Sequence, residues 1–97
     1  MIRLQIHSDT QENAIDLIRS AITAEAARLE LGLKTTERHI RAFEERYHTT
    51  SDAFMGNMAA EDLDGGDAEY VAWAGELNLR QRIAAQLETL KAIQYAA

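Results

Sequence analysis

Apolar side chains recur at steps of three and four residues between positions 15 and 47 of the chain. The stripe consists of Ile15, Ile18, Ile22, Ala26, Leu29, Leu33, Thr36, Ile40, Phe43 and Tyr47. Such spacing keeps side chains on one face of an α-helix. We therefore expect one long helix over residues 10–48. A break near Gly32 remains open, although the stripe keeps its phase across that glycine.

The first residues alternate between apolar and polar side chains, which is the period of a β-strand. Apolar Ile2, Leu4 and Ile6 alternate with polar Arg3, Gln5 and His7. The pattern predicts an extended β-arm over residues 1–8. Because a lone strand leaves its backbone groups unpaired, the arm would need a second subunit or another chain as its partner. The alternative is a frayed terminus.

The second half of the chain predicts a short helix followed by a long one. Thr50 or Ser51 can cap a helix over residues 51–60, and Asp67 can cap a returning helix over residues 67–95. Between them, an aspartate and two glycines at 64–66 favour a turn.

Antiparallel pairing of the two long helices places Tyr47 near Tyr70 and Leu33 near Ala84. Large apolar residues at the tip are expected to form a core cluster rather than a cofactor site. These residues are Phe54, Met55, Met58, Tyr70 and Trp73. The predicted fold class is mainly α, in a single domain over 1–97: a short N-terminal β-arm and an antiparallel long-helix hairpin with a short tip helix, which we expect to be dimeric.

Residues 1–19 project past the returning helix in this register, so their apolar stripe needs a cover from elsewhere. The simplest arrangement is a homodimer in which the arms and helix starts of two copies cover each other. The residues expected at that interface are Ile2, Leu4, Ile6, Ile15, Ile18 and Ile22.

The net charge of −6 is concentrated in one segment. Residues 52–79 carry seven acids and neither Lys nor Arg, whereas the rest of the chain carries ten basic and nine acidic residues. One explanation is solubility. The other is that Asp62, Asp64 and Glu69 meet a basic surface on a partner protein. The same acidity disfavours DNA binding.

The sequence offers no established catalytic or metal-binding pattern, and it contains no cysteine. Glu44 and His48 share a helix face and are interpreted as a surface salt pair rather than metal ligands. A calcium loop starting at Asp62 would need Glu at its twelfth position, where Trp73 stands. We therefore expect no enzymatic activity, no metal and no cofactor. We also expect a cytoplasmic protein, because neither a signal peptide nor a run of roughly 18 apolar residues is present.

Two sequence motifs lie at the predicted tip of the hairpin. Their residues are Tyr47, Ser51 and Phe54 in "YHTTSDAF", then Leu63, Gly65, Gly66, Asp67, Tyr70 and Trp73 in "AEDLDGGDAEYVAW". Together with the preceding arm and helix, they resemble a family of small bacterial and archaeal helical proteins with a "YGMSSEEF" cap and a "GELGDDxDxxEW" turn. This chain lacks the glycine after Tyr47 and has Gly66 where the family usually has an acid. Members are often regarded as antitoxins encoded beside a small toxin-like protein.

The resemblance implies a non-enzymatic, antitoxin-like interaction module that binds or neutralises a small basic protein partner. Two alternatives remain open. One is a DNA-binding regulator with a ribbon-helix-helix-like start, in which Arg3, Gln5 and His7 would face the major groove. The other is a structural coiled-coil scaffold.

Overall fold

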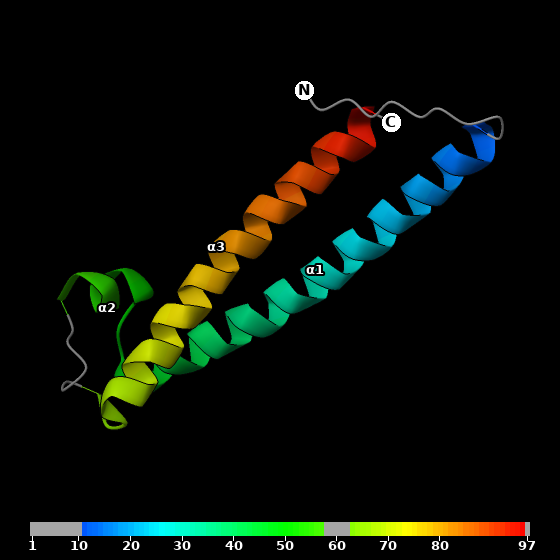
Figure 1. Ribbon diagram of the computed structural model, residues 1–97. Coiled ribbons are helices and arrows are strands. Elements are labelled where there is room, and N and C mark those ends of the chain that lie inside the picture. Colours follow the sequence, from blue (N-terminus) through cyan, green and yellow to red (C-terminus); the bar gives the residue numbers. More distant parts are fainter. Residues whose placement is uncertain (1–10, 58–62, 97) are drawn as a thin grey trace.

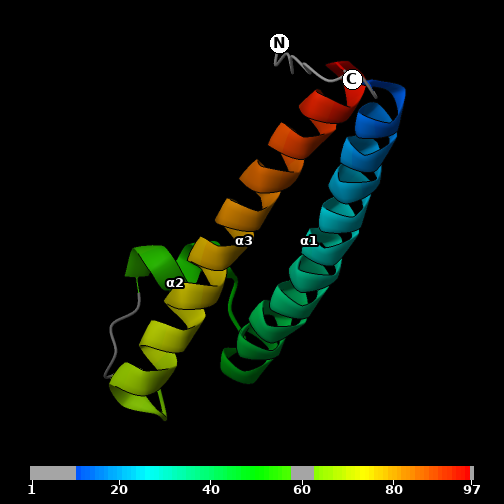
Figure 2. The same ribbon diagram turned by 45° about the vertical axis from the view of Figure 1, so that its right-hand side comes forward.

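The chain folds into a helical hairpin with a short helix packed beside its closed end (Figures 1 and 2). The computed structural model describes residues 11–57 and 63–96, which form α1 (Gln11–Tyr47), α2 (Ser51–Asn57) and α3 (Gly66–Ala96). The two long helices run antiparallel, so the start of α1 and the end of α3 lie at the same end of the molecule. The result is a rod with extents of 61 × 21 × 18 Å.

Helix α1 passes through Gly32 without a break. A Cβ placed on Gly32 would lie 3.7 Å from Ile83 Cδ1, an ordinary van der Waals distance. The glycine is therefore not required by a close approach of the two helices, and the apolar stripe maintains the helix across it.

A narrow apolar core joins α1 to α3 along the middle of the rod. Its buried members are Leu29, Ile83 and Leu87, with Ala26, Leu33, Leu79 and Leu90 packed around them. Towards the open end, Gln94 Nε2 donates to Thr23 Oγ1 at 3.2 Å. This contact has the helix-pairing register expected from the sequence.

A second core lies at the closed end and is built from stacked aromatic rings. Trp73 and Phe54 are fully buried, and their rings stack with centroids 3.9 Å apart. Phe43 and Tyr47 stack on the indole at 5.4 and 5.9 Å. The cluster is packed core, as predicted, with one correction: Met55 is 55% exposed, because α2 turns it away from the rings. Met58 lies outside the described residues.

The corner between α1 and α2 is organised by Glu44. Its backbone carbonyl accepts a hydrogen bond from the Thr49 amide at 3.1 Å, and its carboxylate accepts one from the Ser51 amide at 2.8 Å. Thr50 caps α2 through a 3.1 Å bond from the Ala53 amide to its hydroxyl. Between the helices, His48 adopts a left-handed conformation with φ of 53°, which ends α1.

The expected N-terminal β-arm needs a correction. The structure is all-helical over residues 11–57 and 63–96, where three helices and no strand occur, so the mainly α class agrees and the mixed description is wrong. A strand is stable only beside another strand, and the described part of the chain offers no such edge. Residues 1–8, where the arm was predicted, lie outside the described residues.

Candidate interaction surfaces

Two acidic side chains at the closed end of the hairpin, Asp64 and Glu69, are partly neutralised by an arginine of α1. Arg46 Nη1 on α1 donates to Glu69 Oε1 on α3 at 2.6 Å, and its Nη2 lies 3.8 Å from Asp64 Oδ2. The Glu69 side chain is only 21% exposed, whereas that of Asp64 is 83% exposed. Of the three predicted partner-binding acids, Glu69 is thus held inside the hairpin, Asp64 faces solvent, and Asp62 lies outside the described residues.

Glu69 also accepts a hydrogen bond from the Tyr47 hydroxyl through its second carboxylate oxygen. Burial raises the pKa of Tyr47, and the bond to Glu69 raises it further because it favours the protonated phenol. The arginine, the tyrosine and the glutamate thereby fasten the end of α1 to the start of α3. These three side chains form a structural contact, called here a polar tie, since each polar group has its partner within the hairpin.

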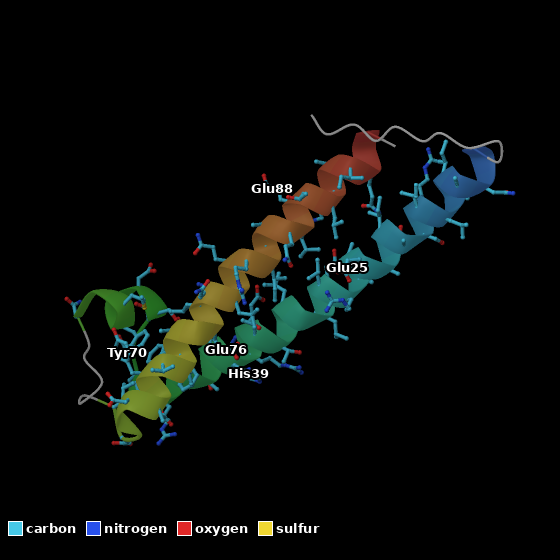
Figure 3. All side chains as sticks on the ribbon, viewed as in Figure 1. Glu25, His39, Tyr70, Glu76 and Glu88 are labelled. Atoms are coloured by element: carbon cyan, nitrogen blue, oxygen red, sulfur yellow. The ribbon has the colours of Figure 1, made fainter. Side chains whose placement is uncertain are left out.

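A second polar tie lies about two turns further along the rod. His39 Nδ1 on α1 and Glu76 Oε1 on α3 are 3.1 Å apart, and the two labelled residues lie near each other on neighbouring helices in Figure 3. The other carboxylate oxygen of Glu76 is buried and has no hydrogen-bond partner among the described residues. We expected neither pair from the sequence, because the contacts join residues 23 or more positions apart.

An open groove of about 930 Å³ lies where all three helices meet. Apolar residues of the two long helices line it, namely Leu33, Ala74, Leu77 and Ala84. Helix α2 contributes Asp52 and the exposed Met55. Glu37 and Arg80 also line it, together with Asn78 and Gln81. The lining of the groove therefore combines apolar and charged side chains, with more acid than base.

A smaller groove of about 370 Å³ separates α1 from α3 nearer the open end. Its lining includes Leu29, Leu90, Glu25 and Arg28. Arg28 forms two hydrogen bonds to Glu25, of 2.5 and 2.8 Å, within α1. The hydrogen bond from Arg28 lowers the pKa of Glu25, because it stabilises the charged carboxylate.

Of the residues predicted to form a dimer surface, the structure describes some and not others. Ile22 is already buried within the chain, at 8% exposure, and Ile15 and Ile18 are half-buried. Ile2, Leu4 and Ile6 lie outside the described residues, as do Arg3, Gln5 and His7, on which the DNA-binding alternative depended. The inner stripe of α1 therefore offers little free apolar area.

The structure instead exposes large apolar side chains for which we did not expect exposure from the sequence. Leu17, Leu31, Met55 and Val71 are between 55% and 71% exposed. A signal was present for two of them, because Leu17 and Leu31 are fourteen residues apart and off the main stripe, so they share a different face of the same helix.

No metal centre is assembled in the described ranges: no group of three or more His, Asp or Glu side chains is arranged there to hold an ion. In place of the expected salt pair with His48, the Glu44 carboxylate accepts a hydrogen bond from the Ser51 amide. Among residues 11–57 and 63–96, none of the helices combines the length and apolar character that a membrane span requires.

Comparisons with known proteins add no relative. No family model matches the chain, and no curated protein and no solved structure matches it.

Proposed function

We propose that this protein is a non-enzymatic interaction module, which holds an amphipathic helix of a small protein partner in the groove between α1, α2 and α3. The observation that supports the proposal is the groove itself, which is lined by apolar side chains of both long helices and by the exposed Met55. Grooves of this kind receive the apolar face of a helix, and an unbranched methionine adapts to the shape of the partner.

Charge favours a basic partner. Glu37 and Asp52 stand at the groove against a single base, Arg80, and the whole chain carries a net charge of −6. Acidic groups at the margin of an interface speed association with a basic protein and select against acidic ones. Asp64 extends this acidic surface at the tip, at 83% side-chain exposure, whereas Glu69 belongs to the internal tie with Arg46.

The antitoxin-like role is part of this proposal and rests on the resemblance of the tip residues. It makes the partner a small basic protein encoded by the neighbouring gene. Expression of both genes together, with a tag on the neighbour alone, tests this part separately: the role is supported if the two proteins purify as a stoichiometric complex, and dropped if the neighbour purifies alone.

Site-specific photo-crosslinking tests the groove. A photoreactive residue replaces Met55 in cells of the organism of origin, and a matched variant carries it at Val71, which is 66% exposed and does not line the groove. We expect one small basic protein to be linked from position 55 and not from position 71. Equal adducts from both positions, or none from position 55, would exclude the groove as the binding site.

A variant that introduces a charge adds a quantitative measurement. With the linked partner purified, Met55→Glu should weaken binding about tenfold or more, because it places a charge in the apolar contact. Val71→Glu should leave the affinity unchanged. Both variants should keep the helical circular dichroism of the parent, since both positions are exposed.

A further inference from the structure

A second apolar stripe runs along α1 on the side away from α3. It consists of Leu17, Ala21, Ala24 and Leu31, all of which are exposed. Their steps of four, three and seven residues keep them on one helix face, distinct from the face that carries the buried Ile22 and Leu29. Among the described residues, no other helix covers this side of α1 in either view (Figures 1 and 2).

The one charged residue within the stripe is held to the side. Arg28 would follow Ala24 in the pattern, but its guanidinium forms two hydrogen bonds with the carboxylate of Glu25. The stripe is otherwise apolar from Leu17 to Leu31, whose side chains are 71% and 66% exposed. They are the two exposed large apolar side chains among the described residues of α1.

The stripe is symmetric about its centre. Leu17 and Leu31 each lie seven residues from Ala24. A seven-residue repeat is the spacing at which two helices pack side by side, and small residues at the centre allow a close approach. An antiparallel copy of α1, related by a two-fold axis near Ala24, would place Leu17 of each copy against Leu31 of the other. This is the self-complementary pattern that an interface between identical subunits requires.

Charges beside the stripe fit the same arrangement. Asp16 and Lys34 lie on one flank of it, and both are exposed. In the antiparallel pairing, Asp16 of one copy and Lys34 of the other lie within about 3 Å of the same height along the helix axes. The symmetry creates this opposite-charge pair twice, on the same flank of the contact.

We infer that the outer face of α1 is a homodimer interface, in which two copies pack antiparallel about Ala24 through Leu17 and Leu31. A single pair of helices over residues 13–35 is about 33 Å long and buries less than the roughly 1,600 Å² of a standard interface. We therefore expect a weak dimer, whose population depends on the protein concentration. It uses none of the residues that line the three-helix groove, so each copy keeps its groove open.

Single cysteines provide the decisive test, because the chain has none of its own. Ala24→Cys places a thiol at the two-fold axis, and Ala42→Cys places one on the same face of α1, beyond the contact. Mild oxidation should convert the first variant into a disulfide-linked dimer at least about tenfold faster than the second. Equal rates would indicate a parallel pair or random collision, and either result overturns the antiparallel interface.

Further variants separate a specific contact from non-specific association. Replacing both Leu17 and Leu31 with Asp should make the protein monomeric by analytical ultracentrifugation at about 100 µM, while Val71→Asp should not change its association. Asp16→Lys and Lys34→Asp should each weaken the dimer, and their combination should restore it. A wild-type chain that remains monomeric at that concentration overturns the inference and assigns the stripe to a different protein, without affecting the result at Met55.

Discussion

Trp73 Nε1 donates a hydrogen bond to Ser51 Oγ at 3.1 Å, and neither residue has appreciable contact with solvent. The bond joins the second turn of α3 to the first residue of α2. It is the polar counterpart of the stacking between Trp73 and Phe54, so one indole ring positions the short helix both by its face and by its edge.

Ser51→Ala should destabilise the protein by about 1–3 kcal/mol, because it leaves the buried indole N–H without an acceptor. Alanine favours helices more than serine does, so propensity would act in the opposite direction. The measurement is urea unfolding followed by circular dichroism. The matched control is Ser20→Ala on the exposed side of α1, which should be neutral or slightly stabilising; a similar effect at both positions would argue against the bond.

Gly66→Ala should also destabilise, by about 1–2 kcal/mol, since Gly66 has φ of +59° and a Cβ is unfavourable in the left-handed region. Gly75 provides the opposite case. It lies within α3, and nothing stands within 4 Å of a Cβ placed there. Gly75→Ala should therefore stabilise the protein by about 0.5–1 kcal/mol in the same urea experiment. If both substitutions had the same sign, the assigned backbone conformation at one of them would be wrong.

Tyr47 makes stability sensitive to alkaline pH. Its folded-state pKa is raised above the ordinary value of 10.0, so the unfolded chain loses the phenolic proton first. This contribution is fully present below pH 10.0 and is lost as the pH rises through the folded-state pKa. Glu69→Gln should lower the pKa of Tyr47, as followed by the ultraviolet absorbance of tyrosinate. Tyr47→Phe should remove that titration and reduce the alkaline loss of stability; an unchanged titration in Glu69→Gln would contradict the contact.

Glu25 gives the corresponding effect in acid. The bond from Arg28 lowers its folded-state pKa below the ordinary value of 4.5, so its contribution is present above pH 4.5 and is lost as the pH falls through the folded-state value. Arg28→Gln should lower the melting temperature at neutral pH and have little effect near about pH 2, where the carboxyl is protonated in both states. The pair is exposed, so the shift should be small. Arg41→Gln serves as the control and should show no such pH dependence.

Periodicity was sufficient to predict the long first helix and its pairing with the last, because a continuous apolar stripe is a local property of the sequence. It could not show that Arg46 and His39 would pair with Glu69 and Glu76, since those contacts depend on how two distant helices are rotated about their axes. The acids therefore looked unpaired within their own segment. The predicted burial of Met55 was wrong for a similar reason. A helix of seven residues is too short for its apolar periodicity to show which side chains face the core.

The packing of α2 against Trp73 allows the docking of this helix to be followed by fluorescence. A helix of seven residues does not persist alone in water, so α2 is formed when Phe54 and Ser51 are in place against Trp73. That residue is the sole tryptophan of the chain. The natural fluorescence of the protein therefore reports the docking of the helix that borders the groove. Emission should shift to longer wavelength when α2 detaches, and it should respond to an occupant of the groove without any added label.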